Sequence, residues 1–118
     1  MDEKEVLKTA RKIRRSGKTW PCSVAEALSF TRAVTFFKGP VTNLNSATCF
    51  PDFESRLTAE VAYSMMLNYI ANLEKPEEVL RLSRNLKRPD LHPEISPQVI
   101  GHRQALEDYQ KIYQKVRQ

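Results

Sequence analysis

The sequence contains few of the residues that cross-link a protein or bind metal ions, since only two of its 118 residues are cysteine and two are histidine. Two cysteines are too few to staple a domain that is long enough to have its own core, so we expect free thiols and a reducing, cytoplasmic location. A zinc site needs about four ligands at short spacing, and this chain has no C-x-x-C and no closely spaced histidines. The available side chains are Cys22, Cys49, His92 and His102. The sequence therefore predicts no metal site.

A catalytic grouping is also missing from the sequence pattern. Nucleophilic catalysis needs a cysteine or serine beside a histidine that a third group orients. Both histidines lie in the C-terminal third, and nothing in the sequence pairs either with a nucleophile. The acidic pairs at positions 77–78 and 107–108 are adjacent, so on a helix their carboxylates would point in different directions. We therefore expect a protein that is not an enzyme and uses no cofactor.

Long hydrophobic runs are absent as well. No apolar stretch approaches the roughly 18 residues of a membrane-spanning helix, and the charged N-terminus lacks the apolar segment of a secretion signal. The composition that is present, with 41% apolar and 28% charged residues, is that of an ordinary globular protein. We expect residues 1–118 to form a single domain.

Apolar residues recur at helical spacing, and the alternation typical of a β-strand is never sustained. We therefore predict an all-α fold, a compact single domain of about five helices around a central buried helix. Its boundaries follow from helix stop signals and from a capping box at Ser23 and Glu26. The predicted helices cover residues 3–15, 23–38, 53–73 and 76–88, and a last helix runs from 97 nearly to the C-terminus.

The helix predicted over 53–73 is the expected central element, because its apolar residues cover more than half of its circumference. We expect the adjacent methionines to fill gaps in the core, as this flexible side chain commonly does. The apolar residues of this segment are Leu57, Val61, Met65, Met66, Tyr69, Ile70 and Leu73.

The stretch Gly17-Lys18-Thr19 matches the end of the phosphate-binding loop G-x-x-x-x-G-K-[ST]. The first glycine of that motif would stand at position 12, which is Lys12. The motif also follows a β-strand, whereas the segment before Gly17 is predicted to be helical. We therefore interpret Gly17 as the residue that ends a helix.

Positive charge is concentrated near the N-terminus. Residues 1–20 contain seven Lys or Arg and three Asp or Glu, which gives +4 of the net +5. Several of these cations follow the i, i+3, i+4, i+7 spacing that places them on one side of a helix, opposite Val6, Ala10 and Ile13. We predict that they contact a nucleic-acid backbone, and the alternative is an ordinary solvated helix face. They are Lys8, Arg11, Lys12 and Arg15, called the basic stripe below, with Lys18 beyond the helix.

A second group of cations closes the helix predicted over 76–88. Arg84, Lys87 and Arg88 would form a second nucleic-acid contact if they faced the same way as the basic stripe. Cations at a helix C-terminus also interact favourably with the helix dipole, so a purely structural role is the alternative.

The segment Ser23-Val-Ala-Glu26-Ala-Leu28, followed by Arg32-Ala33, resembles a capped helix in small uncharacterised bacterial and phage proteins. This resemblance covers a short part of the chain. It implies an origin in a phage or another mobile element, and it assigns no residue a role.

A protein-interaction module is the alternative function, an adaptor or inhibitor that binds an acidic protein partner. The last helix carries a 3-4 alternation that suits a homodimer seam, although packing onto the protein's own core explains the alternation equally well. No membrane partner is expected, because the first helix lacks the bulky apolar face of a membrane anchor. The alternating residues are His102, Ala105, Tyr109, Ile112 and Val116.

Overall fold

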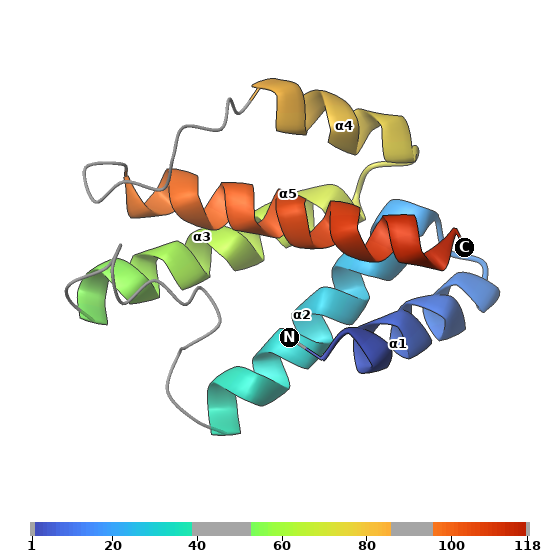
Figure 1. Ribbon diagram of the computed structural model, residues 1–118, viewed down its shortest axis with the longest axis horizontal. Coiled ribbons are helices and arrows are strands. Elements are labelled where there is room, and N and C mark those ends of the chain that lie inside the picture. The colour runs from blue at the N-terminus through green and yellow to red at the C-terminus, as the bar shows by residue number, and fades with distance from the viewer. Residues whose placement is uncertain (1, 39–52, 86–95, 118) are drawn as a thin grey trace.

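The computed structural model describes residues 2–38, 53–85 and 96–117, and within these ranges the only regular secondary structure is α-helix. The prediction of an all-α fold is confirmed. Figure 1 shows the arrangement. The helices are α1 (Glu3–Arg15), α2 (Trp20–Lys38), α3 (Phe53–Ala71), α4 (Pro76–Asn85) and α5 (Pro97–Val116).

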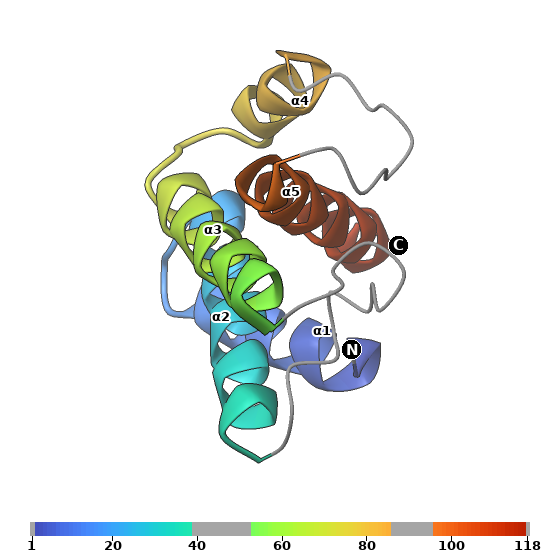
Figure 2. The ribbon, with the colours of Figure 1, turned by 90° about the vertical axis from the view of Figure 1, so that its left-hand side faces the viewer.

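The last helix, α5, occupies the middle of the domain. It contacts each of the other four helices, and α3 packs along it over the most extensive contact in the protein. In Figures 1 and 2, α4 lies on one side of the α3–α5 pair, and α1 with α2 lies on the other. The central position that the sequence analysis gave to the 53–73 segment therefore belongs to α5.

The two central helices approach closely because small residues meet between them. A Cβ atom at Gly101 of α5 would overlap the backbone carbonyl oxygen of Ala59 and lie 2.9 Å from the Cβ of Ala62. Glycine at this position is therefore required by the proximity of the α3 backbone. The sequence analysis did not identify this contact.

The ends of α1 form as their residues predict. The side chain of Asp2 caps the first turn by accepting a hydrogen bond of 3.3 Å from the Glu5 amide. Gly17 follows the helix with a φ of 103°, and its amide donates to the Arg14 carbonyl. Since Gly17 has this left-handed conformation directly after a helix, its role as a helix stop is confirmed.

The start of α2 differs from the prediction. The helix begins at Trp20, and Thr19 is its cap, because the Thr19 Oγ1 accepts a hydrogen bond of 3.3 Å from the Cys22 amide. Ser23 is buried inside the helix, where its hydroxyl donates to the Thr19 carbonyl. The capping box at Ser23 and Glu26 was wrong, because Thr19 offers an earlier cap and Pro21 fits the first turn.

The buried face of α3 also differs from the prediction. Met66, Ile70 and Leu73 do pack on the core. Leu57, Val61, Met65 and Tyr69 are exposed by 38, 52, 62 and 55%. The buried positions are instead Ala59, Ala62, Tyr63 and Leu67 with Ile70, because alanines allow the closest approach to α5. Met65 was therefore wrongly predicted to fill the core.

A buried polar network joins α2, α3 and α5. Arg32 donates two hydrogen bonds, of 2.5 and 2.6 Å, to the carboxylate of Glu60, and its guanidinium lies 4.2 Å from the ring centre of Tyr63. The Tyr63 hydroxyl donates to Asp108, which also accepts from Gln104. Burial raises the pKa of Tyr63 above its ordinary value, and the charge of Asp108 adds to the effect. The network therefore holds a neutral tyrosine between charged groups.

The apolar residues of α5 face the core of the same molecule. Ala105, Tyr109 and Ile112 are fully buried or nearly so. The intramolecular explanation of their 3-4 alternation is therefore correct, and these residues do not form an exposed seam. None of the helices in the described ranges is both long and apolar enough to span a bilayer.

Candidate nucleic-acid interface

The orientation of α1 turns the basic stripe toward solvent. Val6 and Ala10 are completely buried, and Ile13 packs on the edge of the core. The opposite side of the helix is consequently exposed. All members of the basic stripe are exposed there: Lys8, Arg11, Lys12 and Arg15.

Two of the three acidic residues at the start of α1 are engaged away from this stripe. Asp2 is engaged as the helix cap. The Glu3 carboxylate bonds Lys115 and lies 3.3 Å from the ammonium of Lys111, so it points toward α5. Within the part of the chain that the structure describes, no residue of the basic stripe has an ion pair. Glu5 is exposed in the same first turn and has no ion pair with the stripe within the described ranges, so the four cations of the stripe have no ion-pair partner there.

Lys4 extends the basic stripe by one helical turn. It precedes Lys8 by four residues and is likewise exposed. Sequence reasoning did not include it, although the i, i+4 relation to Lys8 was available as a signal. From Lys4 to Arg15 the helix rises about 16 Å, a length over which a nucleic-acid duplex presents several phosphates on one side.

Lys18 does not belong to the uncompensated group. Its ammonium lies 3.2 Å from the carboxylate of Glu26, so its charge is partly satisfied within the molecule. The neighbouring Arg14 donates to the Lys18 carbonyl and lies 5.4 Å from the ring centre of Trp20. Trp20 itself packs edge-on against Tyr113 at the margin of the core. This position matches a core contact better than a base-stacking platform.

Of the second predicted group of cations, only Arg84 lies among the described residues, and its helix lies away from α1. Arg84 is exposed on α4, and α4 lies across the α3–α5 pair from α1, as both views show (Figures 1 and 2). Lys87 and Arg88 lie outside the described residues. Within the described ranges, the candidate interface is therefore the exposed surface of α1.

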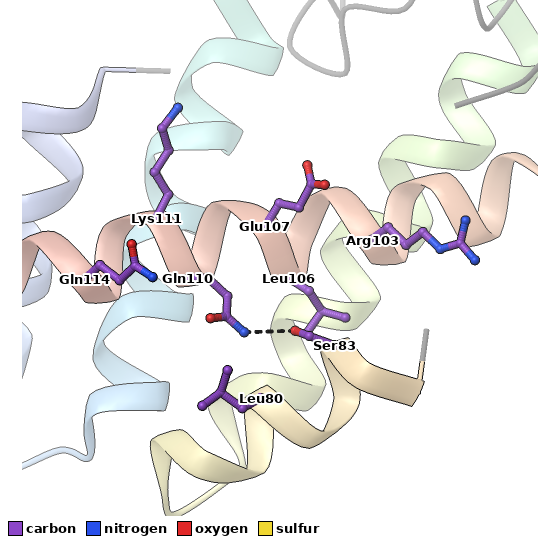
Figure 3. A pocket seen from close by; sticks show the side chains of 8 residues that line it. All are labelled: Leu80, Ser83, Arg103, Leu106, Glu107, Gln110, Lys111 and Gln114. Atoms are coloured by element: carbon purple, nitrogen blue, oxygen red, sulfur yellow. Dashed lines mark hydrogen bonds between the residues drawn. The ribbon is translucent and has the colours of Figure 1, made fainter. Parts of the chain in front are cut away.

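A groove of about 540 Å³ runs between α4 and α5 (Figure 3). The Gln110 side chain crosses it and donates a hydrogen bond of 2.9 Å to the Ser83 hydroxyl. Two guanidinium nitrogens of Arg103 are buried at its edge without a hydrogen-bond partner among the described residues. The groove is lined by Leu80, Ser83, Arg103, Leu106, Glu107, Gln110, Lys111 and Gln114, with neither cysteine nor histidine.

The described residues also contain no group of cysteine, histidine and acidic side chains that would hold a metal ion. Cys22 is a free thiol, and burial together with the nearby Glu26 carboxylate raises its pKa. A raised pKa keeps the thiol protonated and poorly nucleophilic near neutral pH. Cys49 and His92 lie outside the described ranges.

No protein-family model, no curated protein and no solved structure matches this chain. A functional assignment therefore depends on the geometry and charge of the molecule itself. The resemblance of the α2 segment to small bacterial and phage proteins stays a prediction.

Proposed function

We propose that this protein is a non-catalytic nucleic-acid-binding protein that contacts the phosphate backbone through the basic stripe of α1. The observation that carries the proposal is the exposure of four long cations on one helix face, without an acidic partner among the described residues. Arginine and lysine at successive turns suit a row of phosphates, because each contact adds affinity and needs no particular base.

Binding through the basic stripe is expected to weaken with salt by a predictable amount. When a protein neutralises phosphates, counterions are released, and the binding constant falls with salt by a logarithmic slope of about 0.9 for each contact on duplex DNA. Three to four contacts by the basic stripe therefore give a slope of about −3. If the stripe is only a solvated helix face, its removal changes the affinity and the slope no more than the removal of other surface cations does.

Titration of fluorescent duplex and single-stranded oligonucleotides, followed by anisotropy between about 50 and about 200 mM salt, measures this slope. The test variant is Lys8→Gln/Arg11→Gln, which is expected to lower the affinity and to reduce the slope by about half. The control Lys75→Gln/Arg81→Gln removes the same charges from exposed positions at and before α4, outside the predicted contacts. It is expected to bind almost as the natural protein does.

Two results would overturn the proposal. One is the absence of binding to either oligonucleotide at about 10 µM protein in low salt, where even non-specific contacts are measurable. The other is equal loss in the test and control variants, which would indicate a response to net charge alone. An acidic protein partner, the alternative, would be captured from host extract equally well with and without nuclease treatment.

A further inference from the structure

A second row of cations lies beside α1, near the C-terminal end of α5. Figures 1 and 2 show α1 and the C-terminal half of α5 side by side on one face of the molecule, and the two helices are in contact. Lys111 and Lys115, called the α5 row below, are one helical turn apart, and their side chains are 59 and 41% exposed. The cations of this face therefore come from two neighbouring helices.

The carboxylate of Glu3 joins the α5 row to α1. It accepts a hydrogen bond from the Lys115 ammonium, and its other oxygen lies 3.3 Å from the Lys111 ammonium. One carboxylate between two ammonium groups leaves one positive charge in excess. Glu107 rises from the same side of α5 one turn before Lys111, so the row ends there (Figure 3).

The distance between the two helices matches the spacing of two phosphate backbones. Helices in contact have axes about 8 to 10 Å apart. The two strands of a DNA duplex border grooves that are about 6 and about 12 Å wide. Cations on α1 can therefore reach one strand while the α5 row reaches the other. A single strand presents one line of phosphates and would contact only one of the two rows.

The aromatic rings near this face are engaged within the protein. The α1 helix contains no aromatic residue. On α5, the buried ring of Tyr109 stacks on Tyr113, with ring centres 5.8 Å apart. Arg117 lies over the Tyr113 ring, and Trp20 packs edge-on against it. Proteins that prefer single strands stack unpaired bases on aromatic side chains, so this arrangement favours a duplex, which is held through its phosphates.

We propose that the protein binds double-stranded nucleic acid, with the basic stripe of α1 on one phosphate backbone and the α5 row on the other. This inference rests on the proposed function and adds to it the class of nucleic acid and a second set of contacts. Glu3 is an anion already held by the α5 row, so its carboxylate competes with phosphate for the two lysines.

Fluorescence anisotropy with a short DNA duplex and, separately, with one of its strands tests the preference. The natural protein is expected to bind the duplex at least about tenfold more tightly at equal salt, because only the duplex engages both rows. Lys111→Gln/Lys115→Gln is expected to reduce the salt slope on the duplex by about 1 and to change the affinity for the single strand by less than about twofold. The control Lys75→Gln/Arg81→Gln also removes two exposed charges and is expected to keep the preference for the duplex.

Glu3→Gln separates a binding role of the α5 row from a structural one. If the lysines served only to hold α1 on α5, Glu3→Gln and the lysine variant would both weaken binding, because each breaks the same contact. In the proposed complex the two variants act in opposite directions. Glu3→Gln is expected to raise the affinity for the duplex by about threefold, because the α5 row is released to phosphate. The control Glu77→Gln removes an exposed carboxylate from α4 and is expected to have a smaller effect.

Equal affinity for the duplex and the single strand would overturn the inference. Equal losses in the lysine variant and its control would do so as well, and so would a Glu3→Gln variant that binds the duplex no better than the natural protein. Each of these results leaves the proposed function intact as long as the basic stripe accounts for the binding that is measured. Absence of binding to both probes would instead overturn the proposed function, and the preference for a duplex with it.

Discussion

Helices α1 and α3 show how differently two helices of one small domain relate to their sequences. In α1 the apolar and charged residues occupy opposite sides, and the helix docks by Val6 and Ala10 as its spacing predicts. In α3 apolar residues occur on both sides, and the sequence pattern alone does not indicate which side is buried. The larger apolar residues Val61, Met65 and Tyr69 remain exposed while Ala59 is buried.

The two helices differ in the contacts that determine which of their sides is buried. For α1, exposing the apolar side or burying the cations would each cost several kcal/mol, so only one orientation is stable. For α3 both sides are apolar, and the contacts of small residues and of the buried polar network select one of them. Substitutions at these contacts are expected to change the free energy of unfolding by different amounts, and they are taken from the largest expected change to the smallest.

The Arg32–Glu60 ion pair is expected to have the largest effect. Arg32→Met leaves the Glu60 carboxylate buried without its cation, which is expected to lower the free energy of unfolding by about 3 to 5 kcal/mol. Urea unfolding followed by circular dichroism measures the loss. The double variant Arg32→Met/Glu60→Leu removes both charges and is expected to recover much of it. If the single variant loses less than about 1 kcal/mol, the ion pair does not determine the orientation of α3.

Gly101→Ala is expected to destabilise the protein by about 1 to 3 kcal/mol, because its methyl group would overlap the Ala59 carbonyl and separate α3 from α5. The matched control is Met65→Ala on the outer side of α3, which is expected to change monomer stability by less than about 0.5 kcal/mol. Equal losses in both variants would show that the two sides of α3 are equally important for packing.

The sequence predicted the parts of this fold that depend on local signals. The cap at Asp2 was not singled out, but the extent of α1, its stop at Gly17 and its buried side were predicted correctly. The start of α2 was wrong because two hydroxyl residues, Thr19 and Ser23, compete for the cap and sequence does not rank them. In the structure Thr19 is the cap, and Pro21 stands in the first turn, where proline is well tolerated.

Other features depend on contacts between residues far apart in the chain. The approach of Gly101 to Ala59 and the pairing of Arg32 with Glu60 join segments that no local pattern relates. The exposure of the basic stripe followed from the periodicity of α1 alone. The separation of Arg84 from that stripe did not, because it depends on the placement of α4 across the α3–α5 pair.

The two buried tyrosines of the core are expected to differ in their contributions. Tyr63→Phe removes the hydroxyl that donates to Asp108 and is expected to cost about 1 to 2 kcal/mol. Tyr109→Phe removes a buried hydroxyl without a partner among the described residues, so its cost is expected to be close to zero or negative. Thermal unfolding of both variants measures the contrast. Equal losses would show that the hydrogen bond to Asp108 adds nothing.

The same tyrosines predict a loss of stability in alkali. Burial raises the pKa of both Tyr63 and Tyr109 above their ordinary values, so the folded state keeps their protons where the unfolded state loses them. Their contribution to stability is therefore complete below about pH 10, the ordinary tyrosine pKa, and declines as the pH rises further. Urea unfolding at increasing pH is expected to show a steeper alkaline decline for the natural protein than for Tyr63→Phe. Identical slopes would contradict the raised pKa.

The smallest effects on stability are expected on the exposed sides of α1 and α3. Lys8→Gln and Val61→Ser each change an exposed position, so each is expected to alter the free energy of unfolding by less than about 0.5 kcal/mol. Urea unfolding followed by circular dichroism measures both changes. A loss of more than about 1 kcal/mol in Val61→Ser alone would show that the outer side of α3, unlike that of α1, contributes to the packing of the domain.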